Sequence, residues 1–237
     1  MANEFLLIDG VGKVFETGRD VRVVGLREIT LKIERGEFVV VSGPSGSGKT
    51  TLLNIVGGLD DATTGRVVLN GLELTGLGER KLAQMRRDHI GFVFQAYNLI
   101  PVLTARENIG YVMQLQNRAK AEVQGRVEEI AALLGIETLL DKLPNQMSGG
   151  QQQRVAVARA VASKPQLILA DEPTANLDSK TAADLMGMMQ KLNEVEGITI
   201  IFSSHDPLVI GKAKHSIVLQ DGRVVEDHFP GRTDATA

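Results

Sequence analysis

The segment Gly43-Pro44-Ser45-Gly46-Ser47-Gly48-Lys49-Thr50 constrains this chain more than any other. It matches the phosphate-binding loop pattern G-x-x-x-x-G-K-[ST] at every position. The apolar run Phe38 to Val41 precedes it and predicts a buried strand, and Thr51 to Leu59 follows it and predicts a helix. Strand, glycine loop and helix stand in the order that phosphate binding requires.

The residue types of this loop suit a phosphate for physical reasons. Glycines let the backbone turn so that successive N–H groups point into one concavity, and the positive end of the following helix faces the same spot. We expect Lys49 to reach the β- and γ-phosphates and the Thr50 hydroxyl to bind Mg²⁺. The alternative is a chance match in a glycine-rich turn, which the flanking strand and helix disfavour. The sequence therefore predicts a nucleotide site.

Length, net charge and cysteine content limit the folds, partners and chemistry that this chain can have. At 237 residues the chain has room for one sizeable α/β domain with a subdomain. The net charge of −3 gives no global basic field, so we expect no nucleic-acid partner. The chain has no cysteine, which excludes disulfides, cysteine-ligated zinc, iron–sulfur clusters and thiol catalysis.

The chain lacks the patterns of secreted and membrane-spanning proteins. Its first residues do not place a basic region before an apolar one, so we expect no secretion signal. No apolar run approaches the roughly 20 residues that span a bilayer. We expect a cytoplasmic protein without direct membrane insertion, whose membrane role, if it has one, runs through a partner.

Short β-like runs fill residues 3–41. They are Leu6 to Ile8, Val21 to Val24 and Ile29 to Ile33, with turns expected at Gly10, Gly18 and Gly36. This pattern predicts an antiparallel sheet that leads into the strand before the phosphate loop. Phe15 has two interpretations: it stacks on an adenine ring, or it is a core side chain between strands, which its spacing alone favours.

The rest of the chain predicts an α/β core with a helical insert. Helices are expected from Glu79 to Arg87, after Thr104, at about 120–134, from Gln151 to Ala162 and at about 179–194. Strands are expected from Ile90 to Phe94, from Gln166 to Ala170 and from Ile198 to Phe202. The apolar strands alternate with helices, which is typical of a mostly parallel sheet covered on both faces.

Polar residues follow these strands, at the edge where such folds bind ligands. Asp171 is placed to hold Mg²⁺, and Glu172 beside it to accept a proton from the attacking water. Gln95 and His205 follow two other strands, and His205 could hydrogen-bond the γ-phosphate. The alternatives are an acidic turn at the strand end and, for His205, an ordinary surface or capping histidine.

Ser148-Gly149-Gly150, before the helix that Gln151 begins, is a second candidate for anion binding. Two phosphate-grasping features far apart in one chain suggest a nucleotide held between two copies. On this motif alone, an ordinary serine N-cap is the simpler interpretation.

Together these motifs resemble the nucleotide-binding subunit of an ATP-binding-cassette (ABC) transporter. The resemblance rests on GPSGSGKT, Gln95, MSGGQ (147–151), LILADE (167–172), ANLD (175–178) and His205, and it covers essentially the whole chain. It implies a phosphate-loop ATPase fold: a mostly parallel sheet flanked by helices, an antiparallel β subdomain and a helical subdomain. It also implies one domain over 1–237, with 1–95 and 161–237 as the nucleotide-binding core and 96–160 as the helical part.

The resemblance implies a role for each matching residue. Phe15 would stack on adenine, where the family more often has Tyr, and residues 43–51, Thr51 included, would hold the phosphates. Gln95 would contact Mg²⁺ and the attacking water, and Asp171 would hold the Mg²⁺ shell. Glu172 would be the catalytic base, His205 would contact the γ-phosphate, and Asp178 would link two sites. Ser148, Gly149, Gly150 and Gln151 would close over ATP bound to the opposite subunit. Met147 stands where the family usually has Leu, a nearly volume-conserving exchange.

Within the family, residues 91–109 and 148–160 are similar to the lipoprotein-releasing and macrolide-exporting ATPases. This implies an ATP-dependent homodimer on the cytoplasmic face of the inner membrane, where it would drive a separate integral membrane permease by transmitting force. Ala96 to Leu103 is then the candidate segment for docking that permease, or an ordinary packing element of the insert. The alternative function is a cell-division or assembly ATPase whose membrane partner transports nothing.

Overall fold

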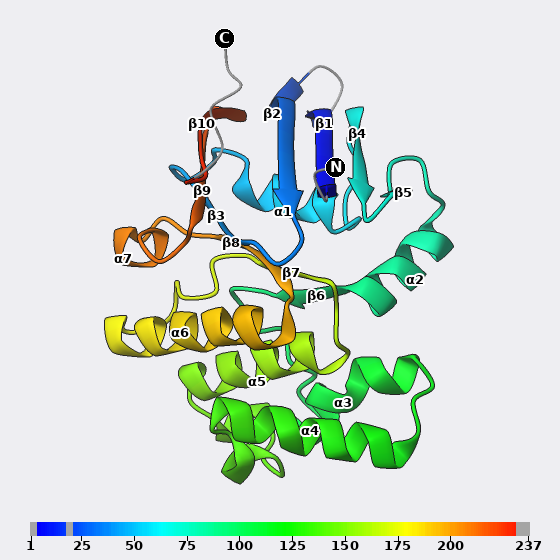
Figure 1. Ribbon diagram of the computed structural model, residues 1–237, viewed down its shortest axis with the longest axis vertical. Coiled ribbons are helices and arrows are strands. Elements are labelled where there is room, and N and C mark those ends of the chain that lie inside the picture. Colours follow the sequence, from blue (N-terminus) through cyan, green and yellow to red (C-terminus); the bar gives the residue numbers. More distant parts are fainter. Residues whose placement is uncertain (1–3, 18–20, 231–237) are drawn as a thin grey trace.

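Two sheets and a group of helices make up the computed structural model, which describes residues 4–17 and 21–230 (Figure 1). The smaller sheet lies at the top of the view, the larger sheet runs from β10 at the upper left to β6 in the middle, and helices α3, α4 and α5 lie at the bottom. This arrangement confirms the predicted α/β class with an N-terminal antiparallel sheet.

The smaller sheet is antiparallel, with strand order β2-β1-β4-β5. Its strands are β1 (Glu4–Thr17), β2 (Val21–Glu34), β4 (Thr64–Leu69) and β5 (Leu72–Glu73). The expected turn at Gly10 is wrong, because Gly10 lies inside β1 with φ 62° at a shift in strand register. Such an irregularity bends a strand without ending it. Gly36 does lie in a turn, and Gly18 lies outside the described residues.

The larger sheet has the order β10-β9-β3-β8-β7-β6. Its strands are β3 (Phe38–Ser42), β6 (Ile90–Val93), β7 (Leu167–Ala170), β8 (Thr199–Ser203), β9 (His215–Gln220) and β10 (Arg223–His228). Neighbours from β9 to β6 pair in parallel, and β10 pairs antiparallel with β9, so the mostly parallel prediction is confirmed.

The central strands β3, β7 and β8 are buried on both faces because the chain builds a core on either side of the sheet. In β3, Phe38 and Val40 belong to the core shared with the helices, whereas Val39 and Val41 belong to the core under the smaller sheet. Alternate side chains of a strand point to opposite faces, which explains why these three strands are mostly apolar on both faces.

Local signals set several helix ends. The helices are α1 (Lys49–Val56), α2 (Glu79–His89), α3 (Ala105–Leu115), α4 (Lys120–Leu134), α5 (Gly149–Ala162), α6 (Ser179–Glu196) and α7 (Pro207–Ile210), with short 3₁₀ turns at Glu137–Leu139 and Pro144–Gln146. Thr104 and Glu107 form the expected capping box of α3, and Gly135 ends α4 with φ 63°. The first helix differs from the prediction: it begins at Lys49 and ends before Gly57, and Gly58 then adopts φ 64°.

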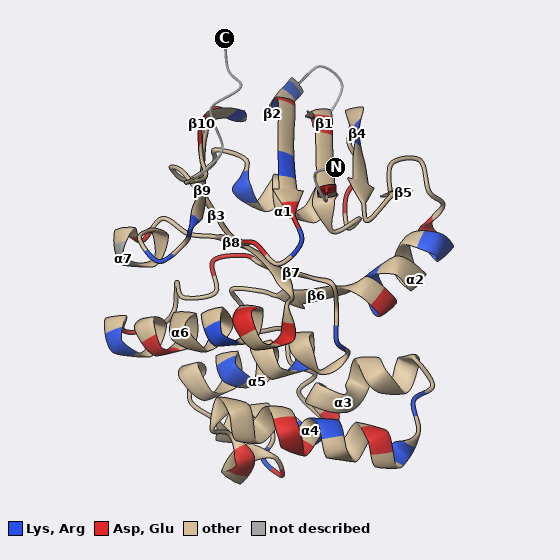
Figure 2. Ribbon diagram, in the orientation of Figure 1, with Lys and Arg blue, Asp and Glu red and all other residues tan. Residues whose placement is uncertain are grey.

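Helices α3, α4 and α5 lie between β6 and β7 in the sequence and pack against one another. Basic and acidic residues both occur along α4 and along α6, as surface helices typically show (Figure 2). Among the described residues no helix is both long and apolar enough to cross a membrane. The division of the chain into a nucleotide-binding core (1–95 and 161–237) and a helical part (96–160) stays a prediction.

A buried histidine links three strands at the amino-terminal edge of the larger sheet. The His215 side chain, which begins β9, is fully buried, with Nδ1 2.5 Å from Glu37 Oε2 and Nε2 2.7 Å from Asp227 Oδ1. Glu37 directly precedes β3, and Asp227 lies in β10. Burial alone would lower the pKa of His215, but hydrogen bonds and charge from Asp227 and Glu37 outweigh it and raise that pKa to about 9.

We expect the free energy of unfolding to fall as pH rises from 6.5 to about 9. The pKa of His215 is higher in the folded state than in the unfolded state. Its contribution to stability is therefore complete at pH values below the unfolded-state pKa and is lost as pH rises through the folded-state pKa. Its size should be on the order of 2 kcal/mol. Denaturant unfolding at a series of pH values measures it.

His215→Gln should remove this pH dependence, whereas His228→Gln, at an exposed histidine of β10, should leave it in place. Equal slopes in the wild type and in His215→Gln would show that the buried histidine is not the titrating group.

Candidate functional site

The phosphate loop, residues 43–50, joins β3 to α1, and its glycines are required by its geometry. Gly43 has φ 139° and Gly48 φ 104°, both in the region that favours glycine. A Cβ atom on Gly43 would lie 2.0 Å from the Leu219 carbonyl oxygen, and one on Gly48 would lie 2.7 Å from the Gly25 carbonyl oxygen. Gly46 has φ 79° and open space beside it. The loop is therefore packed from behind and open in front.

Lys49 lies over the concavity of this loop. Its ammonium group donates to the carbonyl oxygens of Gly43 at 2.9 Å and Pro44 at 3.1 Å, and it lies 3.9 Å from Glu172 Oε1. The hydroxyl of Ser47 is buried and has no hydrogen-bond partner among the described residues. A buried cation and an unsatisfied hydroxyl beside a glycine loop are features that a phosphate ligand would match.

The two carboxylates that follow β7 meet the loop. Asp171 Oδ1 accepts hydrogen bonds from the hydroxyls of Thr50 at 3.1 Å and Ser203 at 2.7 Å. Glu172 Oε2 lies 2.8 Å from His205 Nδ1. The structure thus brings together Lys49, Thr50, Asp171, Glu172 and His205, which the sequence predicted to share one site.

Glu172 has an unusual backbone. Its φ of 47° is in the left-handed region, which is uncommon for a residue with a side chain. Its N–H donates to the Ser203 hydroxyl at 2.8 Å. Sequence reasoning did not single out Ser203. The available signal was its position, since it is the last residue of β8 and ends at the same sheet edge.

Gln95 and Asp178 lie on segments that touch each other. Gln95 is exposed, and its carbonyl oxygen accepts from Asn176 Nδ2 at 3.1 Å. Asp178 caps α6 by accepting from the N–H groups of Lys180 and Thr181 and from the Thr181 hydroxyl. The hydrogen bonds from the Thr181 hydroxyl and N–H lower the pKa of Asp178. The structure therefore places the segment after β6 beside the one after Glu172.

Ser148 is the N-cap of α5. Its hydroxyl accepts from the Gln151 N–H, and the Gln151 side chain accepts from the Ser148 N–H at 2.9 Å, which completes a capping box. A Cβ atom on Gly149 would lie 2.8 Å from the Tyr97 hydroxyl, and one on Gly150 would lie 2.9 Å from Thr181 Cγ2. The glycines allow these close approaches, while Ser148 itself is exposed.

Phe15 lies in β1 with 39 % of its surface exposed, so the core interpretation of this side chain is wrong. Its ring packs so closely over Gly25 that a Cβ atom there would lie 2.7 Å from Phe15 Cε2 and 3.7 Å from Thr51 Cγ2. The Lys13 ammonium lies 5.1 Å from the centroid of the ring. An exposed aromatic ring thus stands beside the beginning of α1, where a base attached to bound phosphates could reach it.

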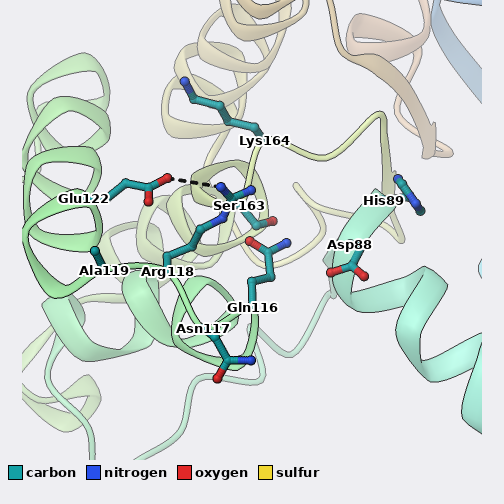
Figure 3. A pocket seen from close by; sticks show the side chains of 9 residues that line it. All are labelled: Asp88, His89, Gln116, Asn117, Arg118, Ala119, Glu122, Ser163 and Lys164. Carbon is teal, nitrogen blue, oxygen red and sulfur yellow. Dashed lines mark ion pairs between the residues drawn. The ribbon is translucent and has the colours of Figure 1, made fainter.

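The described pockets lie at the amino ends of the strands of the larger sheet, opposite the phosphate loop. One, of about 570 Å³, is lined by Asp88 and His89 at the end of α2 and by residues of the α3–α4 connection, among them Arg118, which pairs with Glu122 at 3.4 Å (Figure 3). His89 directly precedes β6, so this pocket is at the amino end of that strand. Another, of about 270 Å³, is lined in part by Glu37 and Lys214, which precede β3 and β9. Both are separate from the phosphate loop.

Comparison with known proteins agrees with this geometry. A family model described as ABC transporter matches residues 26–175, which hold the phosphate loop, Gln95, the Ser148 motif and both carboxylates. The chain belongs to the ABC transporter family. It is therefore an ATPase of the ATP-binding-cassette type, which uses ATP with Mg²⁺.

Several relatives of this ABC ATPase resemble it over most of its length. It is 42 % identical to the lipoprotein-releasing system ATP-binding protein LolD 1 of Chlorobium chlorochromatii, over 96 % of this chain and 93 % of that one. It is 46 % identical to the macrolide export ATP-binding/permease protein MacB of Marinobacter nauticus, over 88 % of this chain but 32 % of that longer protein. These relatives confirm the resemblance to the lipoprotein-release and macrolide-export group.

A solved structure shares the fold. The ATP-binding cassette MJ0796 of Methanocaldococcus jannaschii, in a dimeric post-hydrolysis state bound to ADP and Pi, superposes with a TM-score of 0.89. It is 41 % identical and covers 96 % of this chain and 100 % of that one. The phosphate loop, the buried Lys49 and the Thr50–Asp171 contact of the present chain fit a magnesium nucleotide, since they offer backbone donors, a cation and hard oxygen ligands.

We expect Lys49→Ala to weaken ATP binding by about ten-fold to 100-fold, because a charge-assisted hydrogen bond to phosphate is lost. Calorimetric titration with Mg-ATP measures the change. Lys81→Ala, at an exposed lysine of α2, is the matched control and should bind as the wild type does. Unchanged affinity in Lys49→Ala would contradict the assignment of the loop.

Proposed function

We propose that two copies of this chain close around two Mg-ATP and so drive a separate membrane permease of the lipoprotein-release or macrolide-export type. The observation that carries the proposal is the capped and exposed amino end of α5, an anion-binding feature accessible to a second molecule. The dimeric structure of MJ0796, at 41 % identity, supports the same assembly.

Each chain would supply one half of each site. The loop N–H groups and Lys49 bind the phosphates of one nucleotide, and the Phe15 ring lies where it can stack on the base. Thr50 and Asp171 supply oxygen ligands to Mg²⁺, and Gln95 contacts the metal and the water. Ser148, with its own helix end, closes over the nucleotide held by the partner. Mg-ATP, when bound, supplies the γ-phosphate that water attacks.

Glu172 is proposed as the general base. Its carboxylate is partly buried and lies near Lys49, and it takes the proton from the attacking water onto a carboxylate oxygen. His205 Nδ1, 2.8 Å from Glu172 Oε2, holds that carboxylate. We propose that His205 also contacts the γ-phosphate. Asp178, at the start of α6 beside the Ser148 motif, would link the two sites of the dimer.

The permease is proposed to dock on the helical insert and the segment Ala96 to Leu103, on the cytoplasmic face of the membrane. Val102 in this segment is 79 % exposed, and Leu99 packs against the core shared with α3 and α5. A segment with one side exposed and the other anchored is suited to transmit a displacement. The alternative is a cell-division or assembly ATPase with a membrane partner that transports nothing.

We expect Glu172→Gln to hydrolyse ATP at least about 100-fold more slowly and to form a stable dimer with Mg-ATP. Adding Ser148→Asp should abolish this dimer, because the new carboxylate would repel the phosphate of the facing subunit while still capping α5. Light scattering after gel filtration measures the mass of the complex.

Ser148→Asn in the same background is the matched control, since asparagine is an equally good N-cap without charge, and it should dimerise. An ATP-dependent dimer of equal stability in the aspartate variant would contradict the placement of Ser148 against the partner's nucleotide.

Recovery of the membrane partner tests the permease. Tagged Glu172→Gln, added with Mg-ATP to gently solubilised membranes of the native host, should retain a multi-span protein with a large extracytoplasmic domain. Mass spectrometry identifies it, and the same protein without nucleotide is the control. Enrichment of a soluble or nucleic-acid-associated partner instead would overturn the transporter proposal and leave only the ATPase.

A further inference from the structure

We propose that Ser203 is a positioning residue that fixes both Asp171 and Glu172 for ATP hydrolysis. Its hydroxyl donates to Asp171 Oδ1 at 2.7 Å and accepts from the Glu172 N–H at 2.8 Å. A single hydroxyl thus contacts the side chain of the residue proposed to hold Mg²⁺ and the backbone of the proposed base. This inference rests on the proposed roles of Asp171 and Glu172.

Burial makes these two hydrogen bonds difficult to replace. Ser203 has no exposed surface, so water cannot substitute for the hydroxyl. A serine hydroxyl has one hydrogen to donate, and here it goes to the Asp171 carboxylate, while a lone pair takes the Glu172 N–H. The bond to a carboxylate in a dry environment is stronger than one between neutral groups.

The first bond orients Asp171. Thr50 shares the same Oδ1 atom at 3.1 Å, but Thr50 is itself a proposed Mg²⁺ ligand. Ser203 is not in the phosphate loop and needs no change of partner when the metal binds. It therefore holds the Asp171 carboxylate in one orientation through the catalytic cycle.

The second bond holds Glu172 in its strained conformation. A residue with φ 47° needs its surroundings to keep it there, and the N–H of Glu172 has its acceptor in Ser203. This backbone conformation aims the Glu172 side chain between Lys49 and His205. Ser203 thereby holds both residues of the Asp171–Glu172 pair, the first through its side chain and the second through its backbone.

Ser203 is rigidly placed for this task because it ends a central strand. Its backbone pairs with Val41 of β3, two residues before Gly43, and His205 follows it by two residues. Ser203 therefore moves with the phosphate loop and the His205 segment rather than with a surface loop. A strand end of this kind positions a side chain more accurately than a loop does.

Ser203→Ala tests the inference. We expect kcat to fall about ten-fold, which is the effect of losing one charge-assisted hydrogen bond in the transition state. The KM for ATP should stay within about two-fold, because the loop and Lys49 are untouched, and the Mg²⁺ concentration for half-maximal rate should rise several-fold. Ser203→Thr keeps the hydroxyl and should restore most of kcat.

Thr199→Val is the matched control for the loss of a buried hydroxyl. Thr199 is fully buried at the opposite end of the same strand, and its hydroxyl likewise accepts from a backbone N–H, that of Gly36 at 2.9 Å. It should lower the melting temperature without changing kcat or the Mg²⁺ dependence. Melting temperatures of all three variants are measured alongside the kinetics.

The inference is overturned if folded Ser203→Ala keeps kcat within about two-fold of the wild type. It is also overturned if Thr199→Val lowers kcat as much as Ser203→Ala does. Glu172→Gln separates this failure from failure of the proposed function. If Glu172→Gln hydrolyses ATP slowly and Ser203→Ala has a normal kcat, only the positioning role of Ser203 is rejected. If Glu172→Gln hydrolyses ATP at a near-normal rate, the assignment of Glu172 as the base is rejected.

Discussion

Parallel pairing of β3, β8, β7 and β6 is the constraint on which the site depends. It places the ends of all four strands at one edge, so that Gly43, Asp171, His205 and Gln95 emerge close together although they are far apart in sequence. The pairing persists because a core covers each face of the sheet. The chemistry is thus assembled by buried apolar strands that contain almost none of the reactive groups.

The phosphate loop also depends on elements outside this group of strands. Gly43 packs against the carbonyl of Leu219 in β9, and Gly48 against the carbonyl of Gly25 in β2. The Ser47 carbonyl accepts from the Gly222 N–H in the β9–β10 turn. The loop is therefore held from behind by both sheets, which explains why Gly43 and Gly48 leave no room for a side chain. Gly46 has open space beside it, and glycine is favoured there by its positive φ alone.

Local signals in the sequence were sufficient for most elements and for the main site. The glycine loop, the Thr104 capping box and the stop at Gly135 are each encoded within a few residues. The β9–β10 hairpin was not predicted, although His215, Ile217 and Leu219 alternate with more exposed residues. Ser203, the register shift at Gly10 and the His215 ion pairs depend on partners distant in sequence, and a single sequence does not specify such pairings.

The segment after Gln95 is joined to α5 by hydrogen bonds as well as by packing. Arg159 of α5, whose pKa is lowered by desolvation, donates to the Tyr97 carbonyl at 3.0 Å and to that of Asn98. Tyr97 and Asn98 both have positive φ, and the Tyr97 hydroxyl lies against Gly149. A guanidinium that bonds two consecutive carbonyl oxygens leaves the segment little freedom to deform by itself. We therefore expect a displacement of Tyr97 and Asn98 to reach α5, and with it the Ser148 end that is proposed to close over the partner's nucleotide.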